Sequence, residues 1–134
     1  MTKTAWVFPG QGSQAIGMGV ELQDLPVAKA KFELAEKILG WSVLDICQGD
    51  ETTLACTLYT QPCLYVVESI LVDLLQEKVE LPQLVAGHSL GEYVAASLSG
   101  VFNLKDALSI VQKRGALMQG LPSGKMLSVI LSNN

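Results

Sequence analysis

Residues 87–91 read Gly-His-Ser-Leu-Gly and form the most distinctive chemical motif of the sequence. A short apolar run, residues 84–86, precedes them, and a helix-like stretch, residues 92–98, follows. This order of strand, tight turn and helix is typical of a nucleophile elbow, in which glycines beside the serine permit the sharp turn. The turn presents Ser89 at a helix N-terminus, where developing negative charge is favoured. The motif predicts that Ser89 is the nucleophile of an acyl-transfer reaction, and the alternative is a serine that only shapes the turn.

A nucleophilic serine needs a base for its proton and N–H donors for the oxyanion that forms during the reaction. The backbone N–H of Leu90, the residue after the serine, is the first donor that we expect. His88 is the only histidine of the chain. Neighbouring residues of an elbow point in different directions, so we expect His88 to support the turn and not to take the proton of Ser89. A catalytic triad therefore cannot be completed from these residues.

A glycine-rich segment, residues 10–15, follows an expected strand at residues 4–8. It fits the dinucleotide-binding pattern G-x-G-x-x-G/A. A Rossmann unit also needs an acidic residue near the end of a second strand, but the acidic residues at that distance, Glu33 and Glu36, lie on the polar side of a helical pattern. We therefore expect this loop to present a backbone N–H, from Gln11 or a neighbour, to a bound carbonyl group.

Arg114 falls within the apolar stripe of a helix that the sequence predicts over residues 104–119. A buried arginine is costly without a partner that neutralises its charge. The partner is either a carboxylate of the fold, such as Glu92, or a substrate carboxylate that accepts two bonds from the guanidinium group. The spacing of residues does not decide between these alternatives.

The elements that must position these residues alternate between strands and helices. Strands are predicted at residues 4–8, 84–88 and 126–131. Helices are predicted at residues 26–39, 43–47, 90–99 and 104–119. A connecting region at residues 51–60 leads into a further helix, which opens at residues 60–62 and continues to about residue 78. This alternation favours an α/β fold with a parallel sheet covered by helices on both faces. Three strands are few for such a domain, which suggests part of a larger one.

Composition limits the class of protein. The 134 residues are 49% hydrophobic and 16% charged, enough for one domain with a sizeable core. The net charge of −4 argues against a nucleic-acid partner. The three cysteines (Cys47, Cys56 and Cys63) lack metal-binding spacing, and we expect reduced thiols. The N-terminus has no signal-peptide pattern, and polar residues interrupt the longest apolar run, so we expect a cytoplasmic protein without a membrane span.

Four motifs occur in order along the chain: residues 8–14 (FPGQGSQ), 60–62 (TQP), 87–93 (GHSLGEY) and 114–119 (RGALMQ). Together they resemble the malonyl-CoA:acyl-carrier-protein transacylase family, which includes the acyltransferase domains of fatty acid and polyketide synthases. The resemblance implies that Ser89 takes a malonyl group from malonyl-CoA as an ester. Ser89 would then pass this group to the phosphopantetheine thiol of acyl carrier protein, with no metal and no cofactor.

The same resemblance assigns roles to other residues at the matching positions. The backbone N–H groups of Gln11 and Leu90 would form the oxyanion hole, and Arg114 would bind the free carboxylate of the malonyl group. Gln61 and His88 would be supporting residues near the pocket. The resemblance does not distinguish malonyl from methylmalonyl substrates, or fatty acid from polyketide synthesis.

Members of this family are longer than this chain. Their α/β-hydrolase-like core is interrupted by a ferredoxin-like subdomain, and their catalytic histidine lies beyond it. We therefore expect residues 1–134 to be a partial acyltransferase domain, the N-terminal part of the large subdomain, truncated at residues 125–134 where the small subdomain starts. Transfer by this chain alone would then be impaired, although an oxyanion hole can leave residual catalysis. The alternatives are a non-catalytic fragment or a partner of a separate C-terminal half in a split enzyme, and an unrelated serine esterase.

Overall fold

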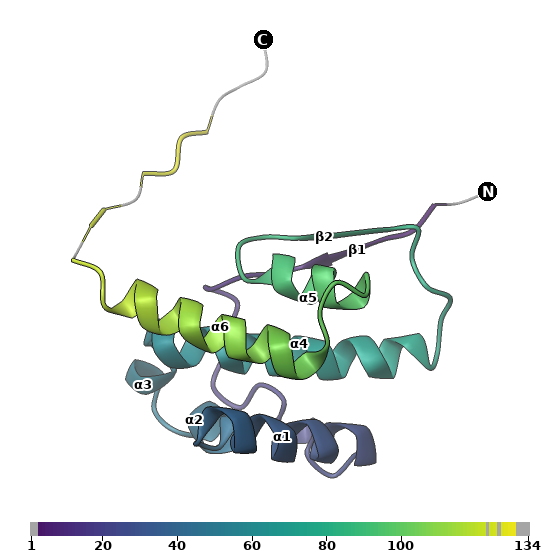
Figure 1. The fold of residues 1–134 in the computed structure, drawn as a ribbon, viewed down its shortest axis with the longest axis horizontal. Coiled ribbons are helices and arrows are strands. Elements are labelled where there is room, and N and C mark those ends of the chain that lie inside the picture. The colour runs from purple at the N-terminus through teal and green to yellow at the C-terminus, as the bar shows by residue number, and fades with distance from the viewer. Residues whose placement is uncertain (1–2, 123, 126, 131–134) are drawn as a thin grey trace.

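The computed structural model describes residues 3–122, 124–125 and 127–130 of the chain (Figure 1). Strands β1 (Ala5–Phe8) and β2 (Leu84–Gly87) pair in parallel, with Ala5 opposite Leu84 and Phe8 opposite Gly87. The helices are α1 (Pro26–Leu39), α2 (Val43–Gln48), α3 (Glu51–Ala55), α4 (Thr57–Gln76), α5 (Gly91–Leu98) and α6 (Leu104–Gln119), and a short 3-10 helix, η1, covers Val20–Leu22. The predicted α/β class, with parallel strands and flanking helices, is confirmed at this level.

Helix α4 is the central element of the molecule. Figure 1 shows α5 next to the sheet, α4 and α6 in the following layer, and α1 with α2 on the far side. All residues of α4 from Thr60 to Ile70 are buried, because the helix contacts neighbours on most of its surface. By length and hydropathy alone, α4 is long and apolar enough to cross a membrane. Of the 18-residue stretch of α4 that meets this criterion, 67% is buried inside the fold.

Side-chain caps hold the N-terminal ends of two of these helices. Ser42 accepts a hydrogen bond from the backbone N–H of Asp45 at 3.2 Å, and Asn103 accepts one from Asp106 at 2.9 Å. Each bond satisfies an N–H group that has no partner within its own helix. Gly40 ends α1 with a φ of 82°, a left-handed conformation that glycine adopts without strain.

The predicted connecting region at residues 51–60 is wrong, because these residues are mostly helical. Asp50 caps α3 by accepting a bond from the backbone N–H of Thr53 at 2.8 Å. Helix α4 then begins at Thr57, and Pro62 lies inside it instead of in its first turn. A proline near the start of a helix removes only one backbone bond there, and the packing of α4 on its neighbours outweighs that loss.

In the described part of the chain, helices cover one face of the sheet, with α5 next to the strands and the layer of α4 and α6 behind it (Figure 1). Phe8 points into the core and is buried, whereas Val7 and Leu84, on the opposite face, are 71% and 63% exposed. The expectation of helices on both faces is therefore not met within the part of the chain that the structure describes. The exposed face is apolar, as is typical of parallel strands that are normally buried on both sides.

The third predicted strand, at residues 126–131, is not formed where it can be assessed. Residues 127–130 have no strand assignment, and Met126 and Leu131 lie outside the described residues. The side chains of Leu127 and Ile130 are 87% and 94% exposed. A strand needs a neighbouring strand for its backbone hydrogen bonds, and residues 127–130 extend away from β1 and β2 (Figure 1).

The cap of α6 provides a test of how this helix is held. Replacing Asn103 with Ala should lower the free energy of unfolding by about 1 kcal/mol, because the backbone N–H of Asp106 loses its acceptor. Asn103→Ser, which keeps an acceptor oxygen, is the matched control and should stay close to wild type. Urea unfolding followed by circular dichroism measures both, and equal losses would contradict the capping role.

Candidate active site

Ser89 occupies the turn between β2 and α5, as the elbow motif predicts. Its φ of 53° lies in the left-handed region, which is unusual for a residue with a side chain. A Cβ atom at Gly87 would overlap the backbone of Gly91, and a Cβ atom at Gly91 would overlap the carbonyl group of Phe8. Both glycines are therefore required for the close approach of strand, turn and helix, and Ser89 is left exposed at the surface of the turn.

The glycine-rich loop after β1 lies against this elbow. The backbone N–H of His88 donates to the carbonyl oxygen of Phe8 at 2.9 Å. A Cβ atom at Gly10 would lie 2.5 Å from the carbonyl oxygen of His88, so only glycine allows this contact. Among the described residues, the backbone N–H groups of Gln11 and Leu90 have no hydrogen-bond acceptor. The oxyanion hole expected from Gln11 and Leu90 remains a prediction.

Arg114 on α6 reaches the nucleophile directly. Its Nη2 atom donates to Ser89 Oγ at 3.0 Å, and its Nη1 atom donates to Gln61 Oε1 at 2.7 Å. The carbon of its guanidinium group also lies 5.5 Å from the centre of the Tyr93 ring, within the range of a cation–π contact. The planar group is thereby held by three neutral partners from α4, α5 and the elbow.

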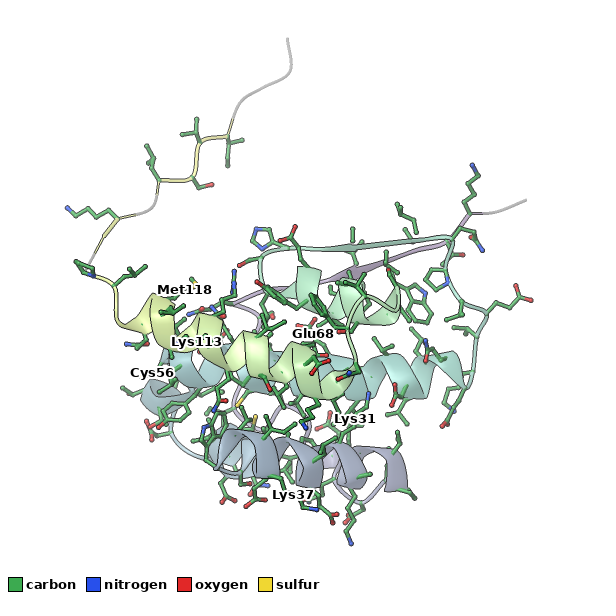
Figure 2. The ribbon with its side chains drawn as sticks, in the orientation of Figure 1. Lys31, Lys37, Cys56, Glu68, Lys113 and Met118 are labelled. Carbon is green, nitrogen blue, oxygen red and sulfur yellow. The ribbon has the colours of Figure 1, made fainter. Side chains whose placement is uncertain are left out.

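Gln61 joins the separate parts of this site through one buried side chain. It is 1% exposed, and its amide nitrogen lies 3.2 Å from Met118 Sδ and 3.5 Å from Gln11 Oε1. The side chain of Gln11 donates in turn to Thr57 Oγ1 at 3.1 Å. Figure 2 labels Met118 near the end of α6, one turn beyond the arginine. The start of α4 thus fixes both the glycine-rich loop and the guanidinium group.

The positive charge of Arg114 is not neutralised by a carboxylate in the described part of the chain. The one salt bridge found there joins Lys31 and Asp73, at 2.8 Å. Glu92, which we considered as a partner, is exposed and makes no ion pair with the arginine. The alternative of a carboxylate within the fold is therefore wrong for the residues that the structure describes, and the guanidinium group remains available to an anionic ligand.

No base lies within hydrogen-bonding distance of Ser89 Oγ in the described residues, where Arg114 is its only bonding partner. An arginine does not take a proton at neutral pH. The imidazole ring of His88 is exposed and forms no hydrogen bond to a described residue. His88 therefore contributes its backbone to the turn, and a role for its ring remains a prediction.

The cysteines are free thiols, as expected, and two of them, Cys47 and Cys63, are buried. Donation of the Cys63 thiol proton to the sulfur of Cys47, together with burial, raises the pKa of the Cys63 thiol. A neutral buried thiol is a poor nucleophile. In the described residues, no three His, Cys, Asp or Glu side chains are grouped so as to hold a metal ion.

Two residues of the site follow from the sequence less directly. Gln61 was expected near the pocket only through the family resemblance, and Tyr93 was not predicted. Tyr93 is four residues after Ser89 and lies on the first turn of α5, which places its ring beside the guanidinium group. Its position at the start of the elbow helix was the available signal, but the contact depends on where α6 packs.

The family described as "Acyl transferase domain" matches residues 5–134 of this chain. The chain belongs to this acyl transferase family. A malonyl CoA-acyl carrier protein transacylase of Synechocystis sp. is 56% identical over 128 residues, which cover 96% of this chain and 44% of that protein. A relative of the same name from Bacillus subtilis is 41% identical, and the match covers 40% of its length. The chain thus spans less than half the length of these acyl transferase relatives.

Solved structures of the acyl transferase family have the same fold over this stretch. The crystal structure of the Synechocystis transacylase superposes with a TM-score of 0.86 at 58% identity, covering 88% of this chain and 40% of that one. A malonyl-transacylase in complex with its type II PKS acyl-carrier protein gives a TM-score of 0.84 at 42% identity, covering 92% of this chain and 42% of that one. The family resemblance inferred from four sequence motifs is confirmed.

The amide of Gln61 offers a test of how the arginine is held. Gln61→Leu should lower the free energy of unfolding by about 1–3 kcal/mol, because Arg114 Nη1 loses its acceptor in a partly buried place. Gln76→Leu makes the same change at the exposed end of α4 and serves as the control. Chemical denaturation measures both variants, and a Gln61→Leu protein as stable as this control would contradict the proposed contact.

Proposed function

We propose that this chain carries the nucleophile, the oxyanion hole and the carboxylate-binding group of a malonyl-CoA:acyl-carrier-protein transacylase. One observation carries the proposal: the guanidinium group of Arg114 lies 3.0 Å from Ser89 Oγ and has no carboxylate partner among the described residues. A cation that neutral groups hold beside a nucleophile suits an acyl group with a carboxylate of its own. An esterase whose acyl substrates carry no carboxylate would not need such a cation.

The first half of the reaction would load the serine. Ser89 Oγ attacks the thioester carbonyl carbon of malonyl-CoA while its proton passes to a base. The oxygen of the tetrahedral intermediate accepts bonds from the backbone N–H groups of Gln11 and Leu90. Collapse of the intermediate breaks the carbon–sulfur bond, coenzyme A leaves as a thiolate that takes up the proton, and a malonyl ester remains on Oγ.

The second half would transfer the malonyl group. The phosphopantetheine thiol of acyl carrier protein loses its proton to the base and attacks the ester carbonyl carbon. The same two N–H groups bind the oxyanion, and the carbon–oxygen bond to Ser89 breaks as the hydroxyl regains a proton. The relatives support these substrates through their names and through the structure that pairs a transacylase with an acyl-carrier protein. Relatives occur in polyketide synthesis as well, and the proposal covers either pathway.

Arg114 would change partners during this cycle. In the free site its Nη2 atom donates to Ser89 Oγ and orients the hydroxyl oxygen. Once Oγ is an ester oxygen it is a weaker acceptor, and Nη2 can turn to the carboxylate of the malonyl group. The bond from Nη1 to Gln61 keeps the guanidinium plane in place during this exchange.

The base would come from outside the described residues, since none of them reaches Ser89 Oγ in a form that accepts a proton. We place it in the part of the family domain that lies beyond the stretch matched here. Transfer by this chain alone is then slow, because the nucleophile lacks its base while the oxyanion hole remains.

The role of Arg114 can be tested in a chimaera in which this chain replaces the matched segment of the Synechocystis transacylase. Arg114→Ala should reduce malonyl transfer to acyl carrier protein about 100-fold or more, because a charged hydrogen-bond pair is lost, and should change acetyl transfer by much less. Transfer is measured by mass spectrometry of the carrier protein. Lys113→Ala removes the neighbouring exposed cation, labelled in Figure 2, and is the matched control.

Two outcomes would contradict the proposal. Equal losses of malonyl and acetyl transfer in Arg114→Ala would indicate a structural role for the arginine. A malonyl adduct that still forms on a Ser89→Ala chimaera would exclude Ser89 as the nucleophile, and intact mass measurement after incubation with malonyl-CoA detects it.

A further inference from the structure

The loop after β1, residues 9–14, carries one of the two N–H groups proposed for the oxyanion hole. Its internal hydrogen bonds are local. The backbone N–H and the hydroxyl of Ser13 donate to the carbonyl oxygen of Gly10 at 3.2 and 2.8 Å, and the backbone N–H of Gly12 donates to Gln14 Oε1 at 2.7 Å. These bonds shape the loop, but they do not fix its direction relative to the nucleophile.

The side chain of Gln11 ties this loop to the rest of the molecule. Its Nε2 atom donates to Thr57 Oγ1 at 3.1 Å, and its Oε1 atom accepts from Gln61 Nε2 at 3.5 Å. Among the described residues, these are the only hydrogen bonds between residues 9–14 and any residue outside that range. The second bond is the weaker one, because Gln61 Nε2 lies closer to Met118 Sδ, at 3.2 Å. Thr57 is therefore the main anchor of the loop.

Thr57 is itself held in place by two helices. It is the first residue of α4 and is half-buried. Helix α6 passes so closely that a Cβ atom at Gly115 would lie 3.0 Å from the carbonyl oxygen of Thr57. Figure 2 shows Cys56, the preceding residue, at the same end of the molecule as Met118 of α6. The hydroxyl that binds Gln11 is thus attached to packed backbone, in a β-branched side chain with few rotamers.

We propose that Thr57 is a positioning residue of the acyl-transfer site, which aims the backbone N–H of Gln11 at the oxyanion by holding the side chain of the same residue. The side-chain amide and the backbone N–H of Gln11 are joined through one Cα atom, so fixing the first restricts the second. Thr57 acts through Gln11 and not on the substrate. This inference deepens the proposed function and rests on it, because it requires that the N–H of Gln11 binds the oxyanion.

The glycines on both sides of Gln11 explain why the loop needs such an anchor. Gly10 is required because a Cβ atom there would lie 2.5 Å from the carbonyl oxygen of His88, and Gly12 has a φ of 112°, which other residues rarely adopt. Glycine also has the largest backbone freedom of any residue. The close approach to the elbow is thus achieved with two flexible residues, and the bond to Thr57 offsets their freedom.

The kinetic consequence of this anchor differs from that of Arg114. An oxyanion-hole donor stabilises the reaction only if it is already aimed at the oxygen on which charge develops. This charge is largest in the tetrahedral transition state, so a loosened donor lowers kcat and leaves KM almost unchanged. The oxyanion forms whether or not the acyl group has a carboxylate. Loss of the anchor should therefore reduce malonyl and acetyl transfer by the same factor, whereas loss of Arg114 should not.

Thr57→Val tests the inference in the chimaera with the Synechocystis transacylase. The change replaces the hydroxyl by a methyl group of similar size, and it should lower kcat of malonyl and acetyl transfer about 10-fold, part of what a whole oxyanion-hole donor contributes. KM for malonyl-CoA should stay within about twofold of wild type. Thr57→Ser keeps the hydroxyl and should restore kcat. Thr52→Val makes the same change at an exposed position of α3 and is the matched control.

Two further measurements separate positioning from a general loss of folded protein. Gln11→Ala removes the same hydrogen bond from its other end, so the double variant with Thr57→Val should lose no more activity than the more impaired single variant. The infrared carbonyl band of the malonyl ester on Ser89, formed from malonyl-CoA isotopically labelled at its thioester carbonyl carbon, reports the oxyanion hole directly. This band should move to higher wavenumber in Thr57→Val, because a carbonyl group that accepts weaker hydrogen bonds has a stiffer double bond.

The possible failures are distinguishable. A Thr57→Val chimaera with the kcat and the carbonyl band of wild type would overturn the positioning role and leave the acyl-transfer proposal intact. Additive losses in the double variant, or a loss that Thr57→Ser shares, would do the same, because they indicate a structural role for Thr57 that does not pass through Gln11. A wild-type chimaera that forms no malonyl adduct on Ser89 would contradict the acyl-transfer proposal, and this inference with it.

Discussion

The guanidinium group of Arg114 between Gln61 and Ser89 is the interaction on which the rest of the site depends. A charge that is half-buried among neutral partners is stable only if each N–H that it directs inward finds an acceptor, and the amide of Gln61 and the hydroxyl of Ser89 supply them. This requirement fixes the position of α6 against the start of α4. The approach is close because Gly115 follows the arginine, where a Cβ atom would lie 3.0 Å from the carbonyl oxygen of Thr57.

Backbone crowding around the nucleophile is the second constraint. Gly87, Gly91 and Gly10 lie where side chains would overlap neighbouring backbone, so the loop after β1, the end of β2 and the start of α5 pack against one another directly. Ser89 adopts a φ of 53° in this crowded turn. In the described residues the backbone N–H groups of Leu90, which follows the serine, and of Gln11, in the adjoining loop, have no acceptor, and these are the donors that we propose for the oxyanion hole.

The described residues are well packed on one side of the sheet and leave an apolar face exposed on the other. Helix α4 is buried over most of its length, yet the outer face of β1 and β2 is apolar and exposed, and the buried carboxylate of Glu68 has no donor among the residues that the structure describes. Each feature alone would be unusual in a finished domain, because parallel strands are normally covered on both faces and buried polar atoms are normally paired. Together they agree with a chain that spans less than half the length of its relatives.

The sequence by itself determined the local features of this protein. The residue patterns predicted α1, α2 and α6 closely, and the glycines around Ser89 predicted the elbow, because these features depend on interactions within a few residues. The predicted start of α4 was wrong, because the packing of this helix outweighs the preference of proline for the first turn. Only the tertiary structure showed that Arg114 contacts Gln61 and Ser89 and no carboxylate among the described residues, and that Glu68 is buried. Those outcomes depend on which helices lie side by side, and residues 50 or more apart in the chain meet there by packing and not by local sequence.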